Sequence, residues 1–128
     1  AYEIGVRLVG SEMFIRDRDN NRINQIFNFV KEEFKRSIPL EEVAELTSMT
    51  VPAFCRFFKK ITGKTFTQFV NEYRLAHAAK LLHEEQMSIT DICFECGFNN
   101  FSHFNKQFKK FTCKSPSKYR NELRVNIS

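Results

Sequence analysis

The sequence predicts an all-α fold, with two tandem helix-turn-helix subdomains joined by a long central helix. Two observations lead to this prediction. From Asn20 onward apolar residues recur at helical spacing, and one pattern of aromatic, basic and hydroxyl residues occurs twice, fifty positions apart. The matching residues are Phe54, Arg56, Phe58, Lys59, Lys60, Thr62 and Lys64 in the first copy and Phe104, Lys106, Phe108, Lys109, Lys110, Thr112 and Lys114 in the second.

A shorter block upstream of each copy matches at an offset of forty-nine. It pairs Glu42, Val43, Ala44 and Met49 with Asp91, Ile92, Cys93 and Phe98. One residue has therefore been gained between the two blocks. A short apolar segment, a turn and a basic amphipathic segment are the sequence form of a helix-turn-helix. We predict one such motif at about 38–63 and another at about 88–113.

Composition is compatible with this prediction but does not require it. A chain of 128 residues forms one or two small domains and can bury a hydrophobic core without disulfides or a structural metal. The net charge of +5 and the pI of about 9.1 favour polyanionic partners. No run approaches about 18 apolar residues and no signal-peptide pattern opens the chain, so neither membrane insertion nor export is expected. Four cysteines without a disulfide framework make a reducing cytoplasm the expected location.

The first eighteen residues are expected to be foreign to the domain. Residues 8–18 resemble the translated product of a transposase-type sequencing adapter, with Phe14 as the one departure, and the chain lacks an initiator Met. Residues 1–18 are therefore expected to be a scar, and the native domain is expected to cover residues 19–128. The alternative is a genuine linker or strand from a lost upstream domain.

The first two predicted helices precede the first recognition helix. A helix from about Asn20 has its apolar residues on one face, at Ile23, Ile26, Phe27, Val30 and Phe34. A short second helix opens at Pro39, where the missing N–H costs little, and ends near Thr47. The acidic residues at its start suit the helix dipole.

The next two helices carry capping signals. Thr50 is predicted to cap a recognition helix over about 51–61 that stops at Gly63. Thr65 to Gln68 is a capping-box pattern that opens a helix over about 66–84. Its roughly eighteen residues span about 27 Å, close to the distance of about 34 Å between successive major-groove faces. Its apolar positions spread around more than one face, as packing against two subdomains requires.

The second motif repeats these signals with two open points. Ser88 opens a fifth helix that closes at Gly97, and either Asn99 or Asn100 opens a second recognition helix over about 100–111. Cys113 replaces the glycine of the first copy, and because a side chain disfavours a left-handed cap, the end of this helix is uncertain from sequence. Ser115-Pro116 opens a seventh helix. No segment is predicted to be a strand.

Each recognition helix is predicted to bury an aromatic face and expose a basic one. At 100° per residue, the buried arcs hold Phe54, Phe57, Phe58 and Ile61 in the first and Phe104, Phe108 and Phe111 in the second, with Phe101 beside them. The opposite arcs hold Pro52, Arg56 and Lys59 in the first and Ser102, Lys106 and Lys109 in the second, flanked by Cys55 and Asn105. A single basic helix face is usually ordinary solvated surface. Two matching basic faces, each on the second helix of its motif, indicate DNA binding.

Four motifs between about Ile38 and Arg120 resemble one family. They are Phe58-Lys59-Lys60-x-Thr62-Gly63, Cys96-Gly97-Phe98 followed by Asn99-Asn100, Phe104-x-x-x-Phe108-Lys109-Lys110, and Ser115-Pro116-Ser117-x-Tyr119-Arg120. In this order they resemble the C-terminal DNA-binding domain of AraC/XylS-type bacterial transcription regulators. The resemblance implies sequence-specific binding of double-stranded DNA without catalysis or a cofactor, with the two recognition helices in successive major grooves. It also implies RNA polymerase as a partner and a separate effector or dimerisation domain that this chain lacks.

Chemistry and the resemblance together predict the contacts. Arg56 and Lys106 occupy matching positions away from the core, where Arg can bind guanine O6 and N7 bidentately. The resemblance adds Pro52, Cys55, Ser102, His103 and Asn105 as base-contacting residues. Pro52 and Cys55 offer mainly apolar contact, for instance to a thymine methyl, whereas Asn105 can pair with adenine. Phosphate contacts are predicted for Thr50, Lys59, Lys60, Lys64, Asn99, Asn100, Lys109, Lys110 and Lys114.

The cysteines and the basic surface leave three further functions open. Cys93 and Cys96 form a C-x-x-C pair, which is compatible with a thiol or metal sensor that also uses Cys113. We prefer small core thiols, because Cys93 matches Ala44, which is predicted to be buried, and no partner pair lies at zinc-finger spacing. An alkyl-transfer repair protein would need an activated cysteine. A protein-interaction module without DNA binding would use the basic surface for a protein partner.

Overall fold

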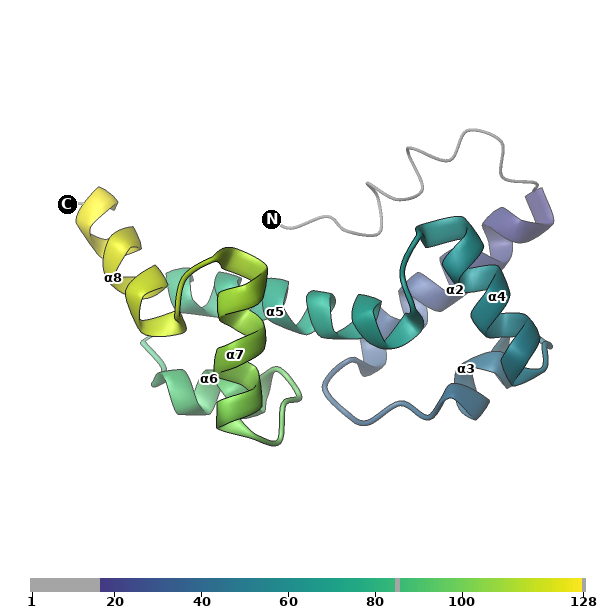
Figure 1. Ribbon diagram of the computed structural model, residues 1–128, viewed down its shortest axis with the longest axis horizontal. Helices are drawn as coiled ribbons and strands as arrows, with labels where there is room; N and C mark the ends of the chain where they lie inside the picture. Colours follow the sequence, from purple (N-terminus) through teal and green to yellow (C-terminus); the bar gives the residue numbers. More distant parts are fainter. Residues whose placement is uncertain (1–16, 85, 128) are drawn as a thin grey trace. The chain divides into compact units, whose positions relative to one another are not determined.

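The computed structural model describes residues 17–84 and 86–127, and all its regular secondary structure there is helical (Figure 1). The helices are α2 (Asp17–Glu33), α3 (Leu40–Leu46), α4 (Val51–Thr62), α5 (Phe66–Glu84), α6 (Ile89–Glu95), α7 (Phe101–Thr112) and α8 (Pro116–Ile127). The prediction of an all-α chain with two helix-turn-helix motifs is confirmed. The scar predicted for residues 1–18 lies outside the described residues, except that α2 already begins at Asp17.

The chain divides into two compact units, each with its own core. The N-terminal unit runs through Asn71 and contains α2, α3, α4 and the start of α5. The C-terminal unit begins at Glu72 and contains the rest of α5 with α6, α7 and α8. One helix-turn-helix, α3–α4 or α6–α7, therefore belongs to each unit.

Aromatic rings from three helices form much of the N-terminal core. Phe54 and Phe58 of α4 are fully buried, as predicted, and their ring centroids lie 5.5 and 5.6 Å from that of Phe66 in edge-to-face contact. Phe69 of α5 packs against Phe58 at 5.5 Å and stacks on Phe27 of α2 at 5.2 Å. These contacts join the beginning of α5 to both α4 and α2.

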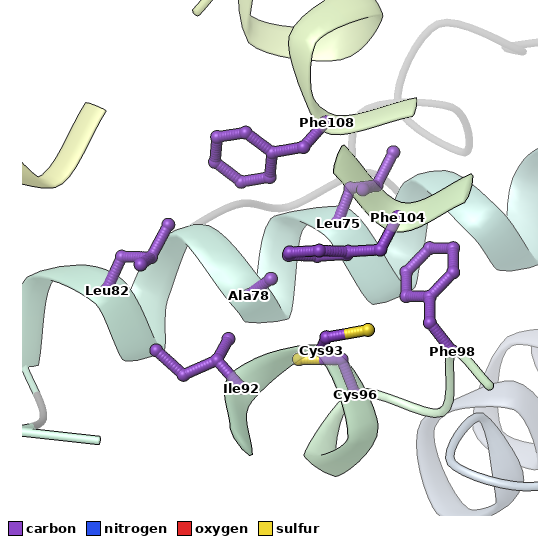
Figure 2. Packing of buried hydrophobic residues seen from close by; sticks show 9 residues of the cluster. All are labelled: Leu75, Ala78, Leu82, Ile92, Cys93, Cys96, Phe98, Phe104 and Phe108. Atoms are coloured by element: carbon purple, nitrogen blue, oxygen red, sulfur yellow. The ribbon is translucent and has the colours of Figure 1, made fainter. Parts of the chain in front are cut away.

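The C-terminal core is built around the second half of α5 (Figure 2). Its buried members are Leu75, Ala78, Leu82, Ile92, Cys93, Cys96, Phe98, Phe104 and Phe108. The apolar residues of α5 that spread around the helix in sequence thus serve two cores, with Phe69 in the first and Leu75 in the second. Figure 2 shows the two sulfur atoms lying among these apolar side chains.

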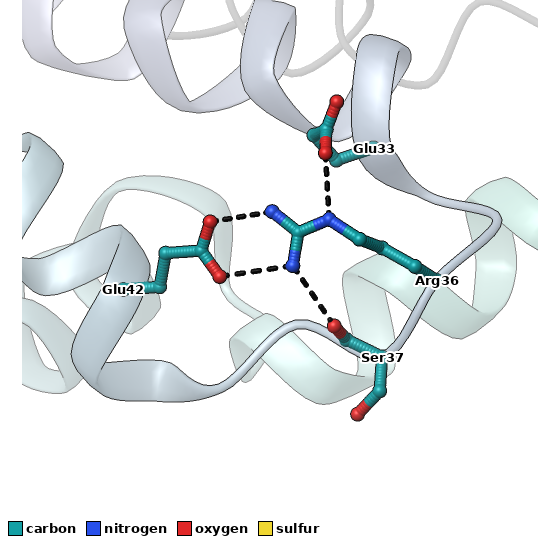
Figure 3. A network of polar contacts seen from close by, with 4 residues as sticks. All are labelled: Glu33, Arg36, Ser37 and Glu42. Carbon is teal, nitrogen blue, oxygen red and sulfur yellow. Dashed lines mark hydrogen bonds and ion pairs between the residues drawn. The ribbon is translucent and has the colours of Figure 1, made fainter.

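A polar network joins α2 to α3 (Figure 3). The guanidinium of Arg36 donates to Glu33 Oε1 at 2.6 Å, to the carbonyl of Ser37 at 3.1 Å and to both carboxylate oxygens of Glu42, one of them at 2.9 Å. These hydrogen bonds, first to Glu42 and then to Glu33, raise the pKa of Arg36, and Arg36 in turn lowers the pKa of Glu42. The network is exposed, so its main effect is to orient the connection between the two helices.

Candidate nucleic-acid interface

The first motif is shaped by the turn between α3 and α4. Ser48 adopts a left-handed φ of 59°, and the N–H of Met49 donates back to the carbonyl of Ala44 at 2.9 Å. Thr50 then caps α4 as predicted, because its Oγ1 accepts from the N–H of Ala53 at 3.3 Å. Pro52 lies in the first turn, where an N–H has no partner within the helix.

The second motif has the same turn with one extra residue. The N–H of Phe98 donates to the carbonyl of Cys93 at 3.2 Å. This hydrogen bond repeats the one from Met49 to Ala44 at an offset of forty-nine residues. Asn100 caps α7 by accepting from the N–H of His103 at 2.8 Å, which repeats the Thr50 cap at an offset of fifty. The residue gained between the blocks is therefore Asn99, and of the two predicted caps Asn100 is the one used.

Both recognition helices end in the same arrangement. Gly63 and Cys113 take left-handed φ values of 76° and 68°, so the cysteine adopts the cap that its side chain disfavours. The hydroxyl of Thr62 donates to the carbonyl of Phe58 at 2.8 Å and accepts from the N–H of Lys64 at 3.1 Å. Thr112 repeats both bonds at 2.9 and 3.2 Å. The repeated threonine therefore fixes the backbone that leaves each recognition helix.

The predicted site residues are accessible. All seven predicted base-reading side chains are exposed: Pro52, Cys55, Arg56, Ser102, His103, Asn105 and Lys106. Among the predicted phosphate-binding residues, Lys64 and Lys114 are half-buried and the others are exposed: Thr50, Lys59, Lys60, Asn99, Asn100, Lys109 and Lys110. Exposure is required for DNA contact but does not identify it, so these roles remain predictions.

His103 and Lys114 also contact other side chains of the protein. The ring of His103 lies 6.0 Å from that of Phe98, centroid to centroid, so it packs beside the motif as well as facing solvent. The ammonium of Lys114 forms an ion pair with the carboxylate of Glu122 in α8, and this contact lowers the pKa of Glu122. Solvent-accessible ion pairs of this kind contribute little net stability.

A buried arginine without a role predicted from the sequence connects α8 to the rest of the C-terminal unit. Arg120 is 8% exposed, and its guanidinium donates to the carbonyl of Met87 at 2.6 Å and to that of Leu82 at 3.4 Å. It thereby links the end of α5 and the start of the second motif to α8. Its place in the Ser115-Pro116-Ser117-x-Tyr119-Arg120 motif is the sequence signal that could have found it.

The cysteines fall into two classes. Cys93 and Cys96 are fully buried in the C-terminal core, as preferred from the sequence, and burial raises the pKa of the Cys93 thiol. Cys55 and Cys113 are exposed, and none of the four cysteines forms a disulfide. Across the described residues, no three or more His, Cys, Asp and Glu side chains form a group suited to a metal ion, and no helix there is long and apolar enough to cross a bilayer.

Known proteins with similar sequences contain the same type of motif. The family described as "Helix-turn-helix domain" matches residues 43–122. The chain is 30% identical over 115 residues to the HTH-type transcriptional activator RhaS of Enterobacter sp. (strain 638), covering 88% of this chain and 41% of the relative. It spans less than half the length of the first curated relatives that it matches, namely 41%, 35% and 32%.

Solved structures share the fold. A probable AraC family transcriptional regulator from Rhodopseudomonas palustris is similar with 24% identity and a TM-score of 0.73, over 80% of this chain and 97% of that chain. The DNA-binding domain of AdpA, solved in complex with a target DNA, is similar with 23% identity and a TM-score of 0.76, over 80% of this chain and 93% of that chain. At these identities the likeness shows the arrangement of helices.

Proposed function

Because the chain belongs to the AraC-type family of DNA-binding transcription regulators, we propose that it binds double-stranded DNA sequence-specifically through α4 and α7. Each helix enters a major groove, and the two grooves are successive. The observation that carries the proposal is the repeated geometry of the two motifs. In each, a capped helix buries two phenylalanines four residues apart and exposes a cation at the matching position, Arg56 or Lys106.

The base readers divide by chemistry. Arg56 reads guanine through O6 and N7, and Lys106 makes a less directional contact of the same kind. Asn105 pairs with adenine N6 and N7, while Ser102 and His103 add polar contacts. Pro52 and Cys55 offer α4 only apolar contact, so α4 reads fewer bases through hydrogen bonds than α7 does.

The phosphate contacts surround these readers. Thr50, Asn99 and Asn100 lie at the starts of the recognition helices, where backbone N–H groups and the helix dipole favour an anion. Lys59, Lys60, Lys109 and Lys110 lie in the last turns, and Lys64 and Lys114 follow them. When DNA binds, Lys114 exchanges Glu122 for a phosphate. Contacts of this class set register and affinity rather than sequence preference.

Selection of bound sequences from random duplex DNA tests the proposal. The full chain should enrich a motif with two conserved blocks, whereas a double variant, Arg56→Ala with Lys106→Ala, should keep salt-dependent binding and enrich less. Lys35→Ala with Lys80→Ala, two exposed lysines outside both motifs, is the matched charge control. If the parent chain enriches nothing while remaining folded, it is a protein-interaction module and not a sequence reader.

The remaining assignments follow from the same family. We place the protein in the bacterial cytoplasm, where a regulator meets chromosomal DNA, and assign it no catalytic activity. RNA polymerase is the proposed protein partner, since a relative is named a transcriptional activator. A sensor based on Cys93 and Cys96 is disfavoured, because burial opposes the thiolate form that metal binding and nucleophilic attack require.

A further inference from the structure

A pocket of about 690 Å³ opens on the N-terminal unit beside the recognition helix. Its walls come from the first residue of α3, from α4 between Cys55 and Lys60, and from the start of α5 with the residue before it. They are formed by Leu40, Cys55, Arg56, Lys59, Lys60, Thr65, Phe66 and Thr67. A volume of this size lies within the range of about 300–1,000 Å³ that is typical of small-molecule sites.

The lining is mainly apolar and includes three cationic residues. Leu40, Phe66 and the β-carbon and sulfur of Cys55 offer apolar surface, while Arg56, Lys59 and Lys60 bring three positive charges. No acidic side chain lines the pocket, so a cation or metal finds no counter-charge there. The lining is complementary to a molecule that has both an apolar body and a negative group.

The far wall of the pocket is held in place by the fold. Phe66 is buried between the rings of Phe54 and Phe58, at 5.5 and 5.6 Å. The start of α5 is fixed by reciprocal hydrogen bonds of 3.0 and 3.1 Å between Thr65 and Gln68. A preformed wall reduces the ordering cost of binding a ligand.

We propose that this pocket binds a small organic anion with an apolar body and that its occupancy competes with DNA for α4. The competition rests on the proposed function, because Arg56, Lys59 and Lys60 line the pocket and are also the proposed DNA contacts of α4. A ligand that occupies these cations lowers the affinity for DNA, and by linkage DNA lowers the affinity for the ligand by the same factor.

Alkylation of Cys55 by N-ethylmaleimide, followed by mass spectrometry of peptides, tests binding without DNA. Cys55 lines the pocket, whereas Cys113 is exposed on the other unit and serves as the control within the same molecule. The probe is 2-naphthoate, and its controls are neutral 2-naphthalenemethanol and inorganic phosphate. At saturation, naphthoate should slow alkylation of Cys55 by about fivefold or more without slowing that of Cys113, and each control should do markedly less.

Charge variants identify the site. Thr67→Glu puts a carboxylate on the pocket wall and should weaken naphthoate binding about tenfold through like-charge repulsion, while Thr67→Gln should change it less than threefold or so. Acidic residues suit the first turn of a helix, so Thr67→Glu should fold normally. Ser117→Glu introduces the same charge at the matching position of the second repeat and should leave naphthoate binding unchanged.

The results separate the ligand site from the DNA-binding function. Selective protection of Cys55, lost in Thr67→Glu, together with displacement of a labelled duplex by naphthoate, supports the proposal. If naphthoate protects Cys55 but does not displace a bound duplex, the proposed competition is wrong. If naphthoate protects Cys55 and the chain binds no DNA, the anion site stands and the proposed DNA-binding function is wrong. Equal protection by phosphate overturns the need for an apolar body. No protection at about 1 mM naphthoate, where binding would be worth less than about 4 kcal/mol, overturns the site.

Discussion

At the residue scale, two cations on α4 are expected to do different things. Both side chains are exposed, and Arg56 lies nearly opposite the buried Phe54 and Phe58. We propose that Arg56 reaches base edges and that Lys60, in the last turn of α4, contacts a phosphate. Arg56→Ala should therefore cost about 1–3 kcal/mol on the selected site and relax preference at one base pair. Lys60→Ala should weaken binding to all sequences and lower the salt slope by about 1.

Titrations of the selected duplex and of random duplex at several salt concentrations measure both effects. The random duplex is the control, because it reports phosphate contacts alone. Equal losses on both duplexes for the two variants would remove base reading from Arg56 and leave it a general electrostatic role.

The cap at Cys113 leads to a stability prediction. Its φ of 68° is unfavourable for a residue with a Cβ, so Cys113→Gly should stabilise the chain by about 1 kcal/mol. The reverse change, Gly63→Ala, should destabilise it by about the same amount. A Cβ at Gly63 would meet no atom within 4 Å, so any loss comes from the backbone conformation rather than from a clash. Chemical denaturation measures both variants, and a stabilising Gly63→Ala would contradict the argument.

At the scale of elements, the recognition helices depend on the phenylalanines beneath them. Phe58 and Phe108 are fully buried, so replacing either by Ala should cost about 3–5 kcal/mol of stability and weaken DNA binding only indirectly. Phe94→Ala, at a residue that is 53% exposed, is the matched control and should stay within about 0.5 kcal/mol. Thermal unfolding followed by far-UV circular dichroism measures the loss of stability. An unchanged melting temperature for Phe58→Ala would exclude Phe58 from the core.

The contact between α2 and α3 should depend on pH. The pKa of Glu42 is lowered from its ordinary 4.5 by the hydrogen bond to Arg36, so the ionised carboxylate stabilises the folded state. That stabilisation is fully present above the unfolded pKa and is lost as pH falls through the lowered folded value. Glu42→Gln should therefore melt below the parent at pH 7, and the difference should shrink as pH falls through 4.5 and below.

The neighbouring Glu41→Gln is the control for this titration. Glu41 is exposed in the first turn of the same helix. Its replacement should remove only the interaction with the helix dipole. A gap between parent and Glu42→Gln that stays constant from pH 7 to strong acid would show that the ion pair with Arg36 is not its source.

At the scale of the whole molecule, α5 runs without interruption from the N-terminal unit into the C-terminal unit. Because one helix links the two motifs, the spacing between the two DNA blocks should matter. Inserting about 5 base pairs turns one block to the opposite face of the duplex and should reduce binding towards that of a single block. Inserting about 10 base pairs restores the face but not the distance and is the control for helical phase. Equal affinity for all spacings would mean that the motifs bind independently.

Much of the fold and part of the candidate site could be predicted from the sequence, because their signals are local. Thr50 and Ser88 cap the helices that follow them, and the Thr65–Gln68 pattern forms the predicted capping box. Burial of Phe54 and Phe58 followed from helical periodicity. Each of these features depends on residues within about one or two turns of one another, so the pattern of residue types is sufficient.

The repeat in the sequence determined by itself that two equivalent helix-turn-helix motifs exist and which of their faces are exposed. Only the tertiary structure decided that Asn99 is the extra residue, that Cys113 adopts the cap of Gly63, and that Arg120 holds the carbonyls of Leu82 and Met87. It also decided the pocket beside α4, which Leu40 and Thr67 line from different helices. The features at Asn99 and Cys113 rest on local hydrogen bonds, but the residue types there allowed more than one arrangement. The contacts of Arg120 and the pocket join segments distant in the chain, and the packing of side chains, which no local pattern encodes, determines which segments come together.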